Sequence, residues 1–369
     1  MVKKVTAQGL YIHLPFCRNK CAYCGFYSET DCMQLQPEYF RALTKDLRSR
    51  ENKNYSTLYI GGGTPSCVDR KLLAAFLDIA SIYQSGVLKE STIEANPESI
   101  DEDFLRLVHR YKFSRISIGC QSTSNEVLSK LTRIHSAEDI FRVYEKIRMF
   151  CPDIAVNLDM IYDIPGVDFE HTHQTIKDFI KLSPEHISAY SYSHDTSLFK
   201  EDDTDTTDFM LVREYLEDAG YNKYEISNYA KKGHESLHNI NYWQLGDYDG
   251  IGSSAWSLKN YADKRVLLGK SDNIHSYIKD PLAYAEKEET YPPQTALEEL
   301  VFGLRITKGV DFEKICVNID AQVKDKMYNA LIQLQKEGLI TWDDSYALLS
   351  RKGELLLDSV QELLWRQLP

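Results

Sequence analysis

Between residues 10 and 192, short runs rich in β-branched and aromatic residues alternate with amphipathic patterns, and this alternation constrains the fold most. The six runs with strand character are residues 10–14, 57–60, 92–95, 115–119, 155–161 and 187–192. Helical spacing of apolar residues lies between them, at residues 39–47, 71–83, 103–110, 137–150 and 173–180. Such alternation predicts an α/β fold with parallel strands and right-handed crossovers. Counting units does not separate a partial barrel from an open doubly wound sheet.

The pattern changes after residue 292. Helices are predicted at residues 296–305, 323–337 and 352–368, with two short strands at 339–342 and 346–349. This order predicts a small C-terminal α+β module of winged-helix type. Upstream, the acidic run Asp202 to Asp208 predicts a solvated loop that opens a helix over 208–219. Residues 221–256 are dense in aromatic residues and glycine, which predicts an ordered, irregular surface piece.

The charge balance restricts the partners. The 369 residues include 55 Asp+Glu and 43 Lys+Arg, a net charge of -12. We therefore expect neither nucleic acid nor an anionic membrane surface as the main partner, because both require a basic footprint. No apolar stretch approaches the length of a membrane span, and MVKKVTAQGL lacks the apolar core of a secretory signal. We expect a cytoplasmic protein.

Three of the eight cysteines form a tight cluster, Cys17, Cys21 and Cys24, with C-x3-C-x2-C spacing. In a reducing compartment such a cluster indicates metal binding rather than disulfides. The remaining five are scattered singly, which is typical of small buried apolar residues, and they are Cys32, Cys67, Cys120, Cys151 and Cys316.

Three interpretations of the cysteine cluster compete. The spacing fits one face of a helix, although Pro15 and Gly25 favour a loop. His13 could join the thiols in a zinc site, although zinc sites usually have two separated ligand pairs. The third and favoured interpretation is a [4Fe–4S] cluster whose fourth iron has no protein ligand, since thiolates suit iron–sulfur centres and a catalytic cluster needs an open position.

The cysteine spacing, with the aromatic Tyr23 before the last cysteine, resembles the signature of the radical SAM superfamily. The resemblance implies that the open iron chelates S-adenosylmethionine and that one-electron reduction can cleave it to a 5'-deoxyadenosyl radical. It also implies that the six strand–helix units form a partial (βα)6 TIM-like barrel.

A glycine-rich segment, 61–66, follows the second predicted strand with the sequence GGGTPS. It can be a simple tight turn, or its glycines can let the backbone approach a ligand. It fits neither the P-loop nor the dinucleotide fingerprint. In the radical SAM resemblance this segment grips the amino group of S-adenosylmethionine.

Four polar residues, Glu94, Gln121, Arg133 and Asp159, lie at or just beyond the ends of predicted strands. Each alone is more typical of a structural hydrogen bond or a surface charge. Arg133 could hold a carboxylate in a fork. The motif order YIHLPFC, GGGTPS, EANPE, SIGCQS, L-x-R-x-H and LDMIYDIPG is similar to the oxygen-independent coproporphyrinogen oxidase group, particularly its HemW-type heme-chaperone branch. The implied S-adenosylmethionine contacts are Tyr11, Tyr23, Gly62, Gly63, Thr64, Glu94, Gln121, Arg133 and Asp159.

Two features separate the two branches of this group. The oxidases have a fourth cysteine two places after the third, where this chain has Phe26. The stretch His238-Asn239-Ile240-Asn241-Tyr242-Trp243 resembles the H-N-x-x-Y-W element of the heme-chaperone branch, which implies that His238 contacts heme. An imidazole can ligate heme iron, and aromatic rings can pack on a flat macrocycle. Without the resemblance, a histidine capping a loop beside core aromatics is the simpler interpretation.

The sequence departs from the branch at two places. The stretch after the sixth strand is shortened and carries His194 and Asp195, and Trp256 stands where the branch tends to have histidine. Both departures put details of the pocket in doubt. A segment at 250–255 mimics a nucleotide fingerprint, but no apolar strand leads into it, so we give it no role.

Together these features predict a partial barrel at residues 1–200, a connecting region at 201–290 and a C-terminal module at 291–369. The leading hypothesis is a heme chaperone that binds a [4Fe–4S] cluster, S-adenosylmethionine and heme, and passes heme to an unidentified acceptor protein. The alternative is an oxygen-independent coproporphyrinogen III oxidase. A third possibility is a zinc-stabilised binding protein. Radical chemistry would also require an electron donor.

Overall fold

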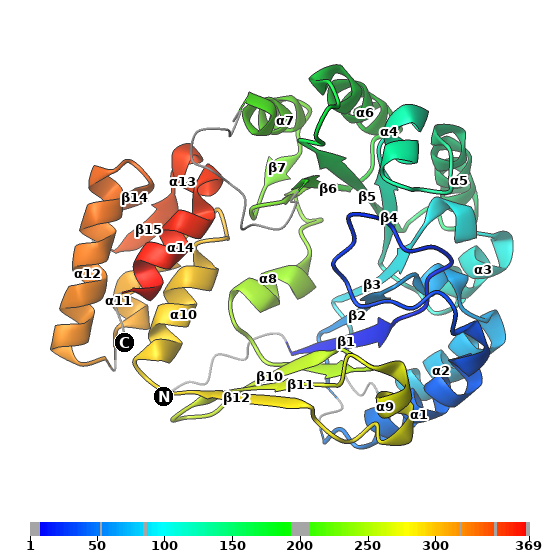
Figure 1. Ribbon diagram of the computed structural model, residues 1–369, viewed down its shortest axis with the longest axis horizontal. Helices are drawn as coiled ribbons and strands as arrows, with labels where there is room; N and C mark the ends of the chain where they lie inside the picture. Colours follow the sequence, from blue (N-terminus) through cyan, green and yellow to red (C-terminus); the bar gives the residue numbers. More distant parts are fainter. Residues whose placement is uncertain are drawn as a thin grey trace.

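The computed structural model describes residues 8–51, 54–83, 87–192, 207–317, 319–342 and 345–366. Six strands of the first half are parallel neighbours in chain order, and they are β1 (Gly9–Leu14), β2 (Thr57–Gly62), β3 (Glu90–Ala95), β4 (Arg115–Gln121), β5 (Ala155–Tyr162) and β6 (His186–Ser191). A doubly wound sheet would reverse its strand order in the middle. The uninterrupted order therefore favours the partial barrel, and Figure 1 shows the strands in an arc with helices outside it.

The outer helices pack on the strands through their apolar faces. The predicted helices are confirmed as α1 (Gln36–Arg48), α2 (Arg70–Tyr83), α3 (Glu102–Arg110), α5 (Ala137–Phe150), α6 (Phe169–Leu182) and α7 (Thr207–Asp218). Local chemistry fixes their starts: Asp101 accepts a hydrogen bond from the backbone N–H of Phe104, and Ser136 forms a capping box with Asp139. A further helix, α4 (Asn125–Lys130), is too short for its spacing to be recognised in the sequence.

The main sheet extends beyond the six expected strands. On the free side of β1 lie parallel β9 (Tyr248–Ile251) and antiparallel β10 (Trp256–Asn260), β11 (Arg265–Gly269) and β12 (Glu286–Thr290). Beyond β6 lie β8 (Asn228–Ala230) and β7 (Asn222–Lys223). The prediction of an irregular surface piece at 221–256 is therefore wrong, because this segment supplies three strands and the helix α8 (Leu237–Trp243).

Strand β9 escaped recognition because its sequence, YDGI, has no apolar run. Asp249 is buried, but it forms ion pairs with Arg50 and Lys259. A Cβ at Gly250 would lie 2.0 Å from the carbonyl oxygen of Trp256, so glycine is required where the chain doubles back into β10. Gly250 belongs to the segment at 250–255 that mimics a nucleotide fingerprint, and its role is to let β9 and β10 pack closely.

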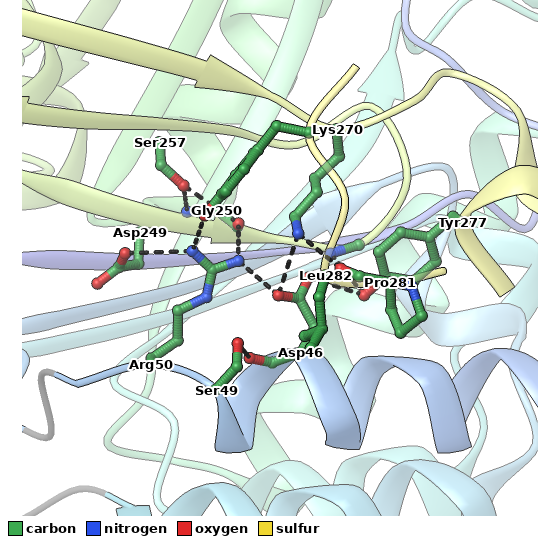
Figure 2. Close-up of polar contacts among 12 residues, drawn as sticks. Asp46, Ser49, Arg50, Asp249, Gly250, Ser257, Lys270, Tyr277, Pro281 and Leu282 are labelled. Carbon is green, nitrogen blue, oxygen red and sulfur yellow. Dashed lines mark hydrogen bonds and ion pairs between the residues drawn. The ribbon is translucent and has the colours of Figure 1, made fainter. Parts of the chain in front are cut away.

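A buried polar network joins α1 to this extension of the sheet (Figure 2). Asp46 is fully buried and accepts hydrogen bonds from Arg50 at 2.5 Å and from the Tyr277 hydroxyl at 3.0 Å. Lys270 forms an ion pair with the same carboxylate at 3.3 Å. Arg50 also donates to the carbonyl oxygen of Gly250 in β9. Charges removed from water are stable only when they are paired in this way.

The C-terminal module has its own hydrophobic core. It contains α10 (Gln294–Gly303), β13 (Val310–Asp311), α11 (Phe312–Ile315), α12 (Ala321–Lys336), β14 (Ile340–Trp342), β15 (Tyr346–Leu349), α13 (Arg351–Leu355) and α14 (Leu357–Trp365). Its three strands form an antiparallel sheet in the order β13-β15-β14. The helix predicted over 352–368 is two helices, because the backbone of Leu356 leaves the helical conformation.

Ion pairs attach the module to the barrel side, and each has at least one buried side chain. Arg265 in β11 pairs with Glu298 and Glu299 in α10, and Glu354 pairs with Arg213 and Lys223. Within the described ranges no helix has the length and apolar character that crossing a membrane requires. The domain limits 1–200, 201–290 and 291–369 stay a prediction, since the main sheet continues from β6 to β12.

Candidate functional site

The cysteine cluster lies in a loop that follows β1 and folds back on itself. Cys17 donates its backbone N–H to the carbonyl oxygen of Glu29, and Glu29 donates to that of Pro15. Residues 17–24 contain only turns, bends and irregular backbone, so the helical interpretation of their spacing is excluded. The three thiols are free, with Cys17 buried and Cys21 and Cys24 partly exposed.

The three thiols are suited to an iron–sulfur cluster. Burial raises the pKa of the Cys17 thiol, and the Thr64 hydroxyl that shares a hydrogen bond with its sulfur acts in the opposite direction. A guanidinium lies beside the same loop, because Arg133 donates from Nη1 to the sulfur of Cys21 at 3.4 Å. Three cysteines on one short loop beside a guanidinium fit a centre in which each sulfur binds a different iron.

The zinc interpretation loses its fourth ligand. Both ring nitrogens of His13 are engaged: Nδ1 lies 3.0 Å from the Tyr11 hydroxyl, and Nε2 lies 3.0 Å from the carbonyl oxygen of Tyr27. Burial lowers the pKa of His13 to about 4, so the ring is neutral. In the part of the chain that the structure describes, no three His, Cys, Asp or Glu side chains are arranged around a single metal ion.

The glycine-rich segment docks directly against the cysteine loop. Gly63 donates to the carbonyl oxygen of Leu14, and Thr64 donates to that of Phe16 at 2.7 Å. A Cβ at Gly63 would lie 2.6 Å from the Phe16 carbonyl oxygen, so no larger residue fits there. The Thr64 hydroxyl shares a hydrogen bond of 3.4 Å with the Cys17 thiol. The turn and the cysteine loop therefore form one unit.

Gly62 orients the same turn toward a carboxylate. Its φ of +111° is a conformation that favours glycine, and its N–H donates to Glu94 at 3.2 Å. The Tyr59 hydroxyl donates to the other oxygen of Glu94 at 2.8 Å. Burial raises the pKa of Glu94 to about 7. Near neutral pH this carboxyl group is only partly ionised, so a cationic ligand would stabilise its charged form.

A second carboxylate, Asp159 in the second half of β5, faces the same region. Asn157 donates to it at 2.7 Å and Ser117 at 3.4 Å. Burial raises its pKa to about 6, and its charge also raises the pKa of Glu94. Parallel strands bring their carboxyl-terminal halves to one side of the sheet, which explains why two residues 65 positions apart influence each other electrostatically.

Arg133 holds the cysteine loop. Its Nη2 donates to the carbonyl oxygen of Gly119 at 2.6 Å, and its Nη1 lies 3.4 Å from both the Cys21 sulfur and the Tyr23 hydroxyl. In this arrangement the guanidinium fork is used by protein atoms. Gln121 follows at the end of β4 with a positive φ of 70°, and it is buried.

Sequence reasoning missed several residues of this site. Thr132 accepts hydrogen bonds from the N–H of Ala22 and the side chain of Asn19, and Asn96 donates to the Thr64 hydroxyl. Asn96 lies inside the quoted motif EANPE, so its position beyond β3 was a usable signal. The sequence offers no signal for Thr132, because its hydrogen-bond partners lie about 110 residues away in the sequence.

The predicted heme residue, His238, lies in α8 and is fully buried. Its Nδ1 is 2.8 Å from the Thr57 hydroxyl, and its Nε2 is 2.8 Å from the Tyr242 hydroxyl. Burial lowers the pKa of His238 to about 3. Both ring nitrogens are therefore satisfied in this conformation. A heme contact through His238 stays a prediction, and it requires the Tyr242 hydrogen bond to open.

The buried carboxylate of Glu90 holds the N-terminus of α8. Glu90 accepts hydrogen bonds from the backbone N–H groups of Leu237 and His238, at 2.9 and 3.1 Å, and it pairs with Arg115. The His238 ring lies 5.2 Å from that of Tyr59, which donates to Glu94. A continuous series of contacts thus connects α8 with the glycine-rich turn.

The two departures noted in the sequence have different outcomes. The Trp256 ring packs on Gly269 of the neighbouring strand, where a Cβ would lie 2.9 Å from it. His194 and Asp195 lie outside the described residues. Phe26, which replaces the fourth cysteine of the oxidases, is 72% exposed beside the cysteine loop.

The barrel order and the cysteine loop define the class of protein. Residues 11–179 match the model of the radical SAM superfamily, and residues 292–356 match that of the HemN C-terminal domain. The fold resembles a solved structure of coproporphyrinogen III oxidase (HemN) from Escherichia coli, with a TM-score of 0.81 and 22% identity, over 97% of this chain and 90% of that one. Membership of this superfamily implies a [4Fe–4S] cluster and S-adenosylmethionine.

Sequence similarity narrows the class to one family. A protein named heme chaperone HemW from Buchnera aphidicola subsp. Schizaphis graminum is 32% identical, over 98% of this chain and 99% of its own. Its namesake from Lactococcus lactis is also 32% identical, over 82% of this chain and 83% of its own. The namesake from Escherichia coli K12 is 29% identical over 98% of both chains. The chain therefore belongs to the HemW family.

Proposed function

We propose that this protein is a cytoplasmic heme chaperone that binds heme and hands it to a heme-requiring protein. The observation that carries the proposal is the placement of α8. This helix holds the His238, Tyr242 and Trp243 side chains, and it contacts the strand that leads into the glycine-rich turn. The names of the relatives and the absence of a fourth cysteine at Phe26 support the same function.

In this proposal, Cys17, Cys21 and Cys24 would hold the [4Fe–4S] cluster. The proposed contacts of S-adenosylmethionine are Tyr11, Tyr23, Gly62, Gly63, Thr64, Glu94, Gln121, Arg133 and Asp159. A reduced cluster at this site would supply one electron for cleavage of the S-adenosylmethionine sulfonium. An external electron donor would have to reduce the cluster first. Glu94 and Asp159 supply negative charge for a cationic ligand, and the glycine turn lets that ligand approach the backbone.

The imidazole of His238 is available to heme iron through one atom. Nδ1 can donate its hydrogen to the Thr57 hydroxyl, which leaves the lone pair of Nε2 directed at the Tyr242 hydroxyl. Neutral imidazole is the form that ligates iron, and burial favours it. Tyr242 therefore competes with iron for Nε2, and displacement of its hydroxyl is the step that would admit heme.

A heme titration with three variants tests this proposal. His238→Ala should weaken heme binding, whereas Tyr242→Phe should strengthen it, because the phenyl ring keeps the packing and frees Nε2. His275→Ala, an exposed histidine on α9 (Ile274–Lys279), is the matched control and should change nothing. Equal heme affinity in the wild type, His238→Ala and Tyr242→Phe would refute a heme contact through His238.

The second candidate is an oxygen-independent coproporphyrinogen III oxidase. The observation in its favour is the shared fold with the Escherichia coli enzyme over almost the whole chain. Turnover of coproporphyrinogen III to a vinyl product by the reconstituted protein would support it. Formation of that product without saturable heme binding would contradict the chaperone proposal.

A further inference from the structure

Arg305 lies where three parts of the fold meet. It follows α10 of the C-terminal module, and the next residue, Ile306, forms an antiparallel bridge with Glu225. Its guanidinium carbon stands 4.3 Å from the centre of the Trp243 ring, at the end of α8. In Figure 1, α8 lies between α10 and the strands of the barrel. Arg305 is thus in contact with the helix that carries the proposed heme residue.

The guanidinium of Arg305, a partly buried residue, differs from those of the buried arginines. Arg50, Arg115 and Arg265 each form at least one ion pair with a carboxylate. Within the described part of the chain, by contrast, the Arg305 side chain has no hydrogen bond and no ion pair. Nε of Arg305 and Nε1 of Trp243 are both buried without a partner, although residue Arg305 as a whole is only partly buried. A half-buried charge without a partner is costly, so proteins rarely keep one without a use.

The surroundings indicate which anion fits. Burial lowers the pKa of Arg305, while the charges of Glu225 and Asp358 act in the opposite direction without forming ion pairs. Two acidic groups nearby disfavour a multiply charged anion such as phosphate, because like charges repel. A carboxylate carries one negative charge, and its two oxygens match the fork of a guanidinium.

We propose that Arg305, stacked on Trp243, binds a carboxylate of a tetrapyrrole, with heme as the ligand in the proposed function on which this inference rests. The propionates of heme are carboxylates at one edge of a flat macrocycle. An Arg305 contact to a propionate would orient the macrocycle relative to α8, and it would connect ligand binding to the C-terminal module through α10.

The experiment compares Arg305→Gln with Arg366→Gln, an exposed arginine of the same module. Heme, heme dimethyl ester and coproporphyrin III are titrated into the full-length, cluster-reconstituted protein. Arg305→Gln should weaken heme binding about 10- to 100-fold, the value of one charge-assisted hydrogen-bonded pair. Esterification of the propionates should weaken binding to the wild type by a similar factor and leave the affinity of Arg305→Gln unchanged. Arg366→Gln should bind heme like the wild type.

Stability separates a binding role from a packing role. Removal of an unpaired buried charge should leave the thermal unfolding midpoint of Arg305→Gln unchanged or raised. A marked fall of this midpoint, with unchanged tetrapyrrole affinity, would show that Arg305 is structural and overturn the inference.

The ligands distinguish the two levels of the proposal. Heme binding that is equal in the wild type and Arg305→Gln overturns the inference and leaves the chaperone proposal intact. Binding of coproporphyrin III alone, weakened in Arg305→Gln, supports the carboxylate site and contradicts heme as the ligand. If neither tetrapyrrole binds to the wild type, both proposals fail.

Discussion

Replacement of Asp46 by asparagine should destabilise the protein strongly, because it removes the central charge of the network in Figure 2. The change keeps the size of the side chain. It leaves the ammonium of Lys270, 1% exposed, without its carboxylate, and it takes from Arg50 its closest partner. The loss of the carboxylate also weakens the contact with Tyr277 in α9.

The structure allows an estimate of the cost. Breaking a buried ion pair by removing one partner costs about 3–5 kcal/mol. Arg50 keeps Asp249 at 3.5 Å and the carbonyl oxygen of Gly250 at 3.2 Å, and Lys270 keeps the carbonyl oxygen of Pro281 at 2.6 Å. These remaining contacts favour the lower end of the range, about 3 kcal/mol.

Urea unfolding followed by tryptophan fluorescence measures this cost, since urea does not screen charges. The control is Glu38→Gln, which breaks an ion pair with Arg41 whose side chains are 45% and 71% exposed. Exposed pairs contribute about 0–1 kcal/mol. If Asp46→Asn lowered the free energy of unfolding no more than the control, the network would not stabilise the joint between α1 and β9.

Two further predictions concern the cofactor site. Cys17→Ser, Cys21→Ser and Cys24→Ser should each lose cluster iron and its visible absorption after reconstitution, whereas Cys316→Ser should keep them; full iron in all three would exclude the assigned ligands. Glu94 has a pKa raised from 4.5 to about 7, so the folded state binds its proton more tightly than the unfolded state. Stability should therefore fall as pH rises from about 4.5 to 7, by about 3 kcal/mol, and Glu94→Gln should lose this part of the pH dependence. Urea unfolding at pH 5 and pH 8 checks the second prediction, and an unchanged pH dependence in Glu94→Gln would contradict it.

Local sequence patterns predict most of the strands and helices of the barrel. Helix α5 and strand β15 have the predicted bounds, because a capping box starts the helix and the strand is a short apolar run, YALL. Strand β9 was missed because its buried Asp249 is paired with Arg50, which follows α1, and with Lys259 in β10, and no local pattern reveals these pairs. Helix α4, with six residues, is shorter than two helical turns.

The residues of the candidate site also differ in how far the sequence predicts them. The three cysteines lie within one short motif and the glycine turn within another, so both could be proposed as site residues from the sequence. The use of Arg133 as a support of the cysteine loop, and the enclosure of His238 by Thr57 and Tyr242, depend on tertiary packing. Arg305 is recognisable only in the structure, since what distinguishes its guanidinium is the lack of a hydrogen bond or ion pair among the described residues.

An anaerobic heme titration of the cluster-reconstituted protein, with a coproporphyrinogen III turnover assay on the same preparation, tests the central claim most directly. Our account predicts saturable one-to-one heme binding, monitored through the heme absorption band. It also predicts no vinyl product in the presence of S-adenosylmethionine and a reductant. Vinyl product formation without heme binding would contradict it.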